Sequence, residues 1–462
     1  MVSVPVRSGW SPSDLWLGPV HRSEVSRHAI SRGWRPRASV ASLIVHTAAD
    51  TSVSELAKRA RAAAAAVAAA TTGAKNAALH AAADGLLVDF DTILAANQVD
   101  VKRAETSGTS EQLVDRLRLD EGRVAAMADG LRQVAGLPDP VGTVTAEWVR
   151  PNGLQMQKVR VPLGVVAIIY ENRPNVTSDA FGLCLKSGNV AFLRGSSGGL
   201  SSNLAITDSI RSSLLGSGLP EDALLLVDDV SREAAVEFMR QRGYVDCLIP
   251  RGGPALIASI LENATVPYVI DGDGNCHVYV DAGADLDMAA RIVHNAKTQR
   301  PSVCNAAESL VVHADVAADF LPLAATVLDG VELVGDERAR ETLPGIGQAE
   351  EADWSTEYLD LKMSIRVVDD IDGAINHINL NGSGHSEAII TGDSIAADRF
   401  TNEVDAAAVL VNASTRFVDG DEFGFGAEIG ISTQKLHARG PMGLEQLTTE
   451  KYIIRGTGQI RP

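Results

Sequence analysis

Cys304 is the residue of this chain whose surroundings best suit covalent chemistry. Two cations, Lys297 and Arg300, precede it in the segment 295–308, NAKTQRPSVCNAAE. A thiol attacks electrophiles as its thiolate, and nearby positive charge favours that form. The alternative interpretation is a buried packing residue, which is the commoner fate of a free cysteine. Because of the cationic flanks, we predict that Cys304 is a catalytic nucleophile.

The elements on either side of Cys304 must hold it in a short connection. Residues 285–300 carry apolar side chains at helical spacing, Asp285 can cap the first turn, and Pro301 stops the helix. Residues 309–313 form a short apolar run that is typical of a buried strand. We therefore expect Cys304 between the end of a helix and the start of a strand.

Upstream, short apolar runs alternate with helical segments, a pattern that indicates a parallel sheet covered on both faces. These runs lie at 163–170, 189–195, 224–229 and 245–250. The first, second and fourth lead into YENRPN (170–175), RGSSGG (194–199) and PRGG (250–253). Ligands bind beyond the carboxyl ends of parallel strands, so these polar loops predict a nucleotide cleft, although no GxGxxG fingerprint is present.

Three further features complete the expected architecture. Helical segments run from about residue 52 to 136, and a second alternating α/β set runs from about 277 to 411. Two extended runs within 147–163 flank an Asn-Gly turn and predict a hairpin arm. Because an isolated hairpin is marginal in water, we expect the strand-like tail at 447–460 to pair with it and the arm to meet a second subunit.

Composition excludes several classes of protein. The chain has 462 residues, 45% hydrophobic and 22% charged, with a net charge of −18, which argues against a nucleic-acid partner. Its four cysteines are scattered, without metal-ligand or disulfide spacing, so we expect no metal and a reducing compartment. No apolar run is long enough for a membrane helix, and a cytoplasmic location is expected.

Residues 1–49, rich in Arg and Ser, indicate a disordered or non-native extension, with a transit peptide as the alternative.

Motifs along residues 52–462 resemble the aldehyde dehydrogenase superfamily. They are YENRPNVT (170–177), LRGSS (193–197), IPRGG (249–253), GNCHVYVD (274–281), NAKTQRPSVCNAAE (295–308), NLNGSGHSEAII (379–390) and VNASTRFVDGDEFGFGAEIGIST (411–433). The most similar branch implies NADPH-dependent reduction of L-glutamyl 5-phosphate to L-glutamate 5-semialdehyde, with release of phosphate, in L-proline biosynthesis. The resemblance also implies an α/β fold of two parallel-sheet domains, one Rossmann-like and one catalytic, with a small β oligomerisation arm.

The resemblance implies roles for individual residues. Cys304 would form the thioester, and Asn172 would polarise its carbonyl. The residues expected to bind NADP are Arg194, Gly195, Ser196, Arg251, Gly252, Gly253 and Glu357. Those expected to bind the glutamyl substrate are Arg173, Asn175, Lys297, Arg300, His385 and Arg416, and for His385 a structural role is the alternative.

One departure from the superfamily bears on the reaction. Hydrolytic members carry a water-activating glutamate about where this chain has Ile270. A displaced base at Asp271 or Asp273 is the less favoured alternative. An acyl-enzyme that must meet hydride or phosphate needs no such base. Alternatives that stay open are another acyl-phosphate or acyl-CoA reductase, an aldehyde dehydrogenase, or a non-catalytic partner of glutamate kinase. A transient contact with that kinase also stays open.

The expected domain boundaries follow from these patterns. The NADP-binding domain is assigned to 50–145, 164–284 and 409–429. The catalytic domain is assigned to 285–408, and the oligomerisation arm to 146–163 and 430–462.

Overall fold

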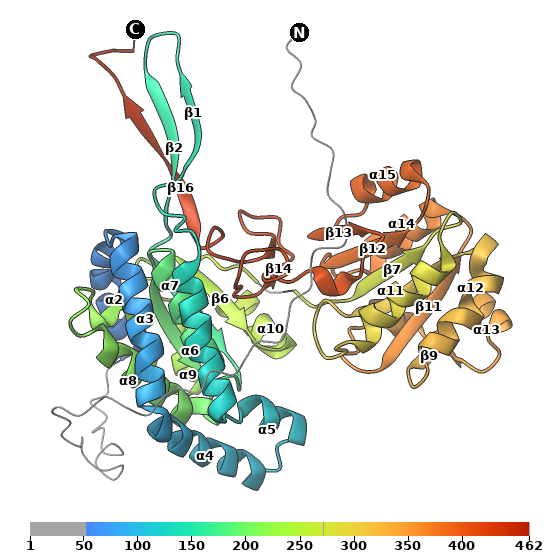
Figure 1. Ribbon diagram of the computed structural model, residues 1–462, viewed down its shortest axis with the longest axis horizontal. Helices are drawn as coiled ribbons and strands as arrows, with labels where there is room; N and C mark the ends of the chain where they lie inside the picture. The colour runs from blue at the N-terminus through green and yellow to red at the C-terminus, as the bar shows by residue number, and fades with distance from the viewer. Residues whose placement is uncertain (1–51, 271, 462) are drawn as a thin grey trace, which may run out of the picture. The chain divides into compact units, whose positions relative to one another are not determined.

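The computed structural model describes residues 52–270 and 272–461 (Figure 1). The expectation for residues 1–49 therefore concerns a part of the chain outside the described residues. Ser52 caps the first described helix by accepting a hydrogen bond from the Glu55 amide. The helices that precede the first strand are α2 (Val53–Ala68), α3 (Thr72–Val88), α4 (Phe90–Thr106), α5 (Glu111–Leu117) and α6 (Glu121–Gly136).

The first α/β domain is built on a four-stranded parallel sheet in the order β5-β4-β3-β6. Its strands coincide with the four predicted apolar runs. They are β3 (Val165–Tyr170), β4 (Val190–Gly195), β5 (Leu224–Val227) and β6 (Cys247–Arg251). The helices among them are α7 (Asn175–Lys186), α8 (Leu200–Leu214), α9 (Arg232–Phe238) and α10 (Pro254–Asn263). The predicted parallel sheet is confirmed.

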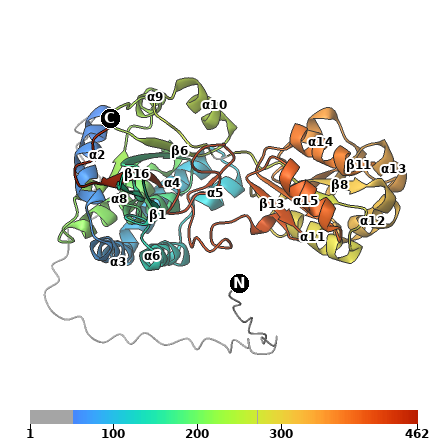
Figure 2. The same ribbon diagram turned by 90° about the horizontal axis from the view of Figure 1, so that it is seen from above.

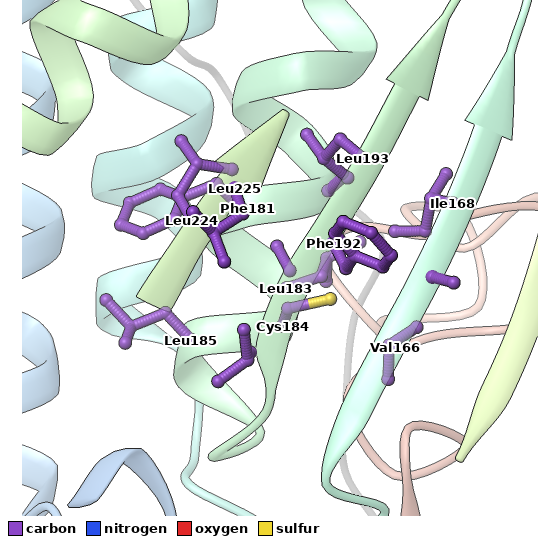
Figure 3. Packing of buried hydrophobic residues seen from close by; sticks show 14 of the residues in the cluster. Val166, Ile168, Phe181, Leu183, Cys184, Leu185, Phe192, Leu193, Leu224 and Leu225 are labelled. Carbon is purple, nitrogen blue, oxygen red and sulfur yellow. The ribbon is translucent and has the colours of Figure 1, made fainter. Parts of the chain in front are cut away.

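The core of this domain forms where α7 packs on the sheet. Figure 3 shows Phe181, Leu183 and Leu185 of α7 beside Phe192 of β4 and Leu224 of β5. Ala-rich α2 also contacts β3, β4 and β5, whereas α3 and α6 pack mainly on other helices. Thus α2 covers the sheet directly, and α3 and α6 lie in a second layer of helices.

The second α/β domain contains a seven-stranded parallel sheet in the order β10-β9-β11-β8-β7-β12-β13. Its strands are β7 (Cys276–Val280), β8 (Ala307–His313), β9 (Glu332–Gly335), β10 (Gly347–Gln348), β11 (Lys362–Val368), β12 (Ser386–Ile390) and β13 (Ala408–Val411). Its helices are α11 (Leu286–Thr298), α12 (Ala314–Val327), α13 (Glu337–Thr342), α14 (Ile371–Asn381) and α15 (Ser394–Glu403) (Figure 2). Two separate apolar clusters fill the space under these helices.

The sheet pairing corrects the expected domain boundaries. Residues 164–284 and 409–429 were assigned to the cofactor domain, but β7 pairs with β8 and β12, and β13 pairs with β12. Both strands therefore belong to the catalytic sheet. The alternating α/β set predicted at about 277–411 spans nearly all of both strands, so this pattern gives the boundary of the catalytic sheet better than the assigned ranges do.

The predicted arm is present as a three-stranded antiparallel sheet in the order β1-β2-β16 (Figure 1). Its strands are β1 (Val144–Val149), β2 (Gln155–Pro162) and β16 (Thr448–Arg455). Gly153 occupies the turn with φ +86°, which favours glycine. The residues between the catalytic sheet and β16 form a two-stranded piece, β14 (Ile431–Ser432) with β15 (Gly440–Pro441), which is separate from the arm sheet.

Candidate active site

Cys304 lies in the connection between α11 and β8, as predicted. Asp285 caps α11 by accepting a hydrogen bond from the Met288 amide at 2.9 Å. After the helix, the Ala306 amide donates to the Val303 carbonyl at 3.0 Å, so Cys304 occupies the corner of a tight turn. Its side chain is half-buried, whereas the other three cysteines of the chain are buried. Cys304 is thus the cysteine that a substrate can reach.

Two of the predicted cations accompany Cys304. The Arg416 guanidinium donates from Nε to Gln299 Oε1 at 2.8 Å and contacts Asn305, the residue after the nucleophile. Burial and the neighbouring charge of Arg300 lower the pKa of Arg416, while Asp419 and Cys304 act in the opposite direction. Arg300, Arg416 and Cys304 therefore share one electrostatic environment, which suits a thiolate and an anionic substrate.

Lys297 does not join them. Its side chain is fully buried, and its ammonium forms an ion pair with the equally buried carboxylate of Glu308. It also lies over the ring of Tyr358, 6.0 Å from the centroid. Burial lowers the pKa of Lys297 and raises that of Glu308. A substrate carboxylate would have to displace Glu308, so this arrangement favours a structural role for Lys297 over the expected substrate contact.

The Lys297–Glu308 pair helps to position Glu357. The second oxygen of Glu308 accepts a hydrogen bond from the Leu359 amide at 3.1 Å, and Leu359 has a φ of +56°. The Glu357 carboxylate in turn accepts a hydrogen bond from the Gly274 amide at 2.9 Å. Glu357 is half-buried. It lies close to the Cys304 loop, because the Gly274 residue that donates to it is packed against the Cys304 backbone.

His385 lies behind the nucleophile loop and is completely buried. Its Nδ1 is 2.7 Å from Ser386 Oγ and 3.7 Å from Cys276 Sγ, while its Nε2 has no hydrogen-bond partner. Burial lowers the pKa of His385 to about 4. A neutral, enclosed imidazole fits the structural alternative, and a role in substrate binding would require the loop around it to open.

The buried imidazoles predict a stability loss in mild acid. Burial lowers the pKa of His385 to about 4 and that of His377 to about 3. Between these values and an unfolded pKa of about 6.5, the unfolded chain binds more protons, so stability falls as the pH drops below about 6.5. Each group should remove on the order of 3 kcal/mol by pH 4.

Thermal melts from pH 7.5 to 4.5 would test this expectation. His377→Gln should flatten the decline, whereas the exposed His294 makes a matched control, since His294→Gln should leave the slope unchanged. Burial raises the pKa of Glu308 to about 7 and that of Asp179 to about 6, which adds stability as the pH falls, so the comparison between the two variants decides. Equal slopes for His377→Gln and His294→Gln would contradict the assignment of a buried neutral His377.

The first sheet brings the predicted polar loops together at one edge. β3 lies between β4 and β6, and Tyr170 at its end is in register with both Gly195 and Arg251. Asn172 has a φ of +41°. Its side-chain Oδ1 accepts a hydrogen bond from Ser196 Oγ at 2.9 Å, and its backbone N–H donates to the same hydroxyl at 3.2 Å. These contacts leave the side-chain Nδ2 of Asn172 able to donate a hydrogen bond to a ligand.

Arg194 is also placed at this edge, where its side chain is largely buried. Its Nη2 donates to the Ser231 carbonyl at 2.6 Å, and its Nε has no partner. Burial lowers the pKa of Arg194, and Asp229 partly offsets this effect. An orphaned guanidinium nitrogen at the end of a strand fits a site for an anionic or polar cofactor group.

Glu171, at the same edge, is not among the site residues predicted from the sequence. Its carboxylate accepts a hydrogen bond from the Gly253 amide at 3.1 Å, and a Cβ on Gly252 would lie 2.9 Å from it. It therefore occupies the glycine loop before α10. Arg251 is half-buried nearby, while Arg173 and Asn175 are exposed, with Asn175 donating to Asp179 at 2.9 Å.

The positions considered for a water-activating base are 270, 271 and 273. Ile270 is buried, and its amide donates to Gln434 at 2.9 Å. Asp273 is exposed, and Asp271 lies outside the described residues.

Within residues 52–270 and 272–461, no group of three His, Cys, Asp or Glu side chains is arranged to hold a metal ion. In the same residues, no helix is both long and apolar enough to cross a bilayer.

Comparison with known proteins agrees with this geometry. The model of the aldehyde dehydrogenase family matches residues 35–359. Gamma-glutamyl phosphate reductase from Moorella thermoacetica is 58% identical over 406 residues, which cover 87% of this chain and 97% of that protein. The same-named protein from Syntrophomonas wolfei is 54% identical over 414 residues, with 89% and 99% covered. The crystal structure of gamma-glutamyl phosphate reductase from Thermotoga maritima superposes with a TM-score of 0.88 at 48% identity, covering 89% of this chain and all of that one.

The chain therefore belongs to the aldehyde dehydrogenase family, and within it to the gamma-glutamyl phosphate reductases. The predicted α/β fold and the predicted class, an oxidoreductase acting on aldehydes, are confirmed. Membership of this family implies a nicotinamide cofactor.

Proposed function

We propose that this enzyme reduces L-glutamyl 5-phosphate to L-glutamate 5-semialdehyde with NADPH, releasing phosphate, in L-proline biosynthesis. The observation that carries the proposal is the turn at Cys304, where a half-buried thiol shares its environment with Arg300 and Arg416. The printed name of relatives more than 50% identical over nearly their whole length supports the same substrate.

In this mechanism Cys304 supplies the nucleophile. The thiolate adds to the acyl carbon of the substrate, the carbon–oxygen bond to phosphate breaks, and a glutamyl thioester forms on Cys304. The Arg300 and Arg416 guanidinium groups bind the substrate's phosphate and carboxylate, for which their planar donors are well suited. Asn172 donates from its amide nitrogen to the carbonyl oxygen, where negative charge develops.

When bound, the nicotinamide cofactor would supply hydride to the thioester carbon. The tetrahedral anion formed on Cys304 would then collapse by breaking its carbon–sulfur bond, which releases the aldehyde and regenerates the thiolate. Ile270 at the position of the hydrolytic glutamate leaves no carboxylate there to activate water, so the thioester is protected from hydrolysis.

The residues at the polar edge of the first sheet fit the phosphate groups of a nicotinamide cofactor. Arg194 has an unpartnered Nε, and the Gly195–Ser196 and Arg251–Gly253 segments frame the same edge, so these residues fit an adenosine phosphate and the pyrophosphate. Glu357 would hold the nicotinamide ribose. Because the Glu171 carboxylate now contacts the Gly253 amide, cofactor phosphate would replace it there.

Arg194→Ala should discriminate between the two nicotinamide cofactors. Removing a guanidinium that meets the 2′-phosphate is expected to raise KM for NADPH about tenfold or more while changing KM for NADH less than threefold. Steady-state kinetics with both cofactors measure this. Arg232→Ala, an exposed change on α9, serves as the control. Equal effects on the two cofactors would refute the assignment of Arg194 to the 2′-phosphate.

The function itself is tested by the requirement for phosphate in the reverse direction. The enzyme should reduce NADP⁺ with glutamate 5-semialdehyde only when inorganic phosphate is present, and should be far slower with simple aldehydes. Activity with coenzyme A in place of phosphate would instead indicate an acyl-CoA reductase. Complete inactivity combined with retention of glutamate kinase from solution would indicate a non-catalytic partner of that kinase.

A further inference from the structure

A second cysteine holds the backbone of the nucleophile. Cys276 is the first residue of β7, and its thiol donates a hydrogen bond to the carbonyl oxygen of Cys304 at an Sγ–O distance of 3.1 Å. The side chain of Cys276 is completely buried. Because Cys304 is at the corner of the 303–306 turn, its carbonyl points away from the turn's own hydrogen bond and needs a donor from elsewhere.

The contact is close because Gly274 and Cys304 lie directly against each other. A Cβ on Gly274 would come within 1.7 Å of the Cys304 carbonyl oxygen, so only glycine fits there. The Gly274 amide donates to Glu357, which ties this segment to the wall of the site. The peptide after Cys304 is thus held from one side by the start of β7.

The opposite side of the turn is held by Asn305. Its Nδ2 donates to the Val418 carbonyl at 2.9 Å, and its Oδ1 accepts from Arg416. The nucleophile turn is therefore fixed between two segments, and Cys276 contacts the Cys304 peptide group directly.

Cys276 has the properties that this role requires. Burial, followed by the charges of Glu387 and Cys304, raises the pKa of its thiol well above the ordinary value, so it stays a protonated donor. A deprotonated Cys276 could not donate to the Cys304 carbonyl oxygen. His385, whose Nδ1 lies 3.7 Å from Cys276 Sγ, is the neighbour on the other side of the sulfur.

We propose that Cys276 is a positioning residue for the nucleophile: its S–H···O=C hydrogen bond sets the orientation of the Cys304 peptide, and with it the direction in which the Cys304 thiol points. This inference rests on the proposed role of Cys304. A small misplacement of a reacting group can cost a large factor in rate, so a single weak hydrogen bond at this point has a measurable effect.

The experiment compares Cys276→Ala, which removes the donor, with Cys276→Ser, which keeps one. Alanine should lower both kcat and the rate at which iodoacetamide alkylates Cys304 about tenfold, with KM for NADPH unchanged. Serine should restore both rates to within about threefold of the native enzyme. Cys184→Ala, in the buried face of α7, is the matched control and should change the melting temperature only.

The alkylation rate, followed by mass spectrometry of the peptide that contains Cys304, does not depend on turnover. It therefore separates a failure of this proposal from a failure of the proposed reaction, which would appear as turnover by Cys304→Ser. Alkylation and kcat of Cys276→Ala within twofold of the native values would overturn the proposal, and so would equal losses in the alanine and serine variants. If the alanine variant does not fold, the serine variant decides: more than tenfold loss refutes the proposal, and near-native rates support it.

Discussion

Replacing Cys304 with serine is expected to lower NADPH oxidation with glutamyl phosphate by a factor on the order of 10³ or more. A serine hydroxyl remains protonated at neutral pH. The cations Arg300 and Arg416 stabilise an existing thiolate but cannot deprotonate an alcohol. Single-turnover measurements with saturating substrate would report the loss in the chemical step directly.

The fold should survive this change, because Cys304 is half-buried in a turn and serine has a similar size. Cys247→Ala, at a buried cysteine of β6, is the control and should keep its activity. Circular dichroism and the melting temperature of both variants establish that they are folded. A folded Cys304→Ser enzyme with turnover near the native rate would contradict the thioester mechanism.

The strands of the first sheet could be predicted from the sequence, because each one is marked by a local run of apolar residues. Each apolar run of the first sheet ends close to where β3, β4, β5 or β6 ends, and the polar loops then meet because parallel strands share one edge. The division into domains was harder to predict. Whether β7 or β13 joins one sheet or the other depends on pairing between residues far apart in the chain, which composition does not encode.

The candidate site divides in the same way. The position of Cys304 followed from its neighbours in sequence, and Arg416 was placed beside it by the resemblance to a family. Lys297 could have been recognised as buried, since it follows Val293 by one helical turn on the apolar face of α11. Its partner Glu308 lies within a strand that is buried except at its last residue, and a carboxylate in such a strand is a sign of an ion pair. No local pattern, however, indicates that Cys276 reaches the Cys304 carbonyl.

The arm gives the second large expected effect. β2 is the central strand of its sheet, so β16 covers one of its sides over the full register from Thr448–Pro162 to Arg455–Gln155. Exposed apolar side chains remain on the edge strands, including Trp148 and Tyr452, whose rings meet edge to face at 6.2 Å. Unpaired strand edges with exposed aromatic side chains favour association with another chain. We therefore propose a homodimer at least, formed through this arm.

Deleting residues 448–462 should abolish this association and leave monomers or insoluble protein, because it removes β16 and leaves β1 and β2 as a marginal hairpin. The cut spares Leu447, which is buried and whose carbonyl accepts a hydrogen bond from Asn189 at 2.8 Å. Removing only residues 457–462, beyond the end of β16, is the matched control and should keep the native assembly. Light scattering at assay concentration measures the mass of each form. The proposed interface is wrong if the intact enzyme is an active monomer, or if the 448–462 deletion has the same mass per particle as the control.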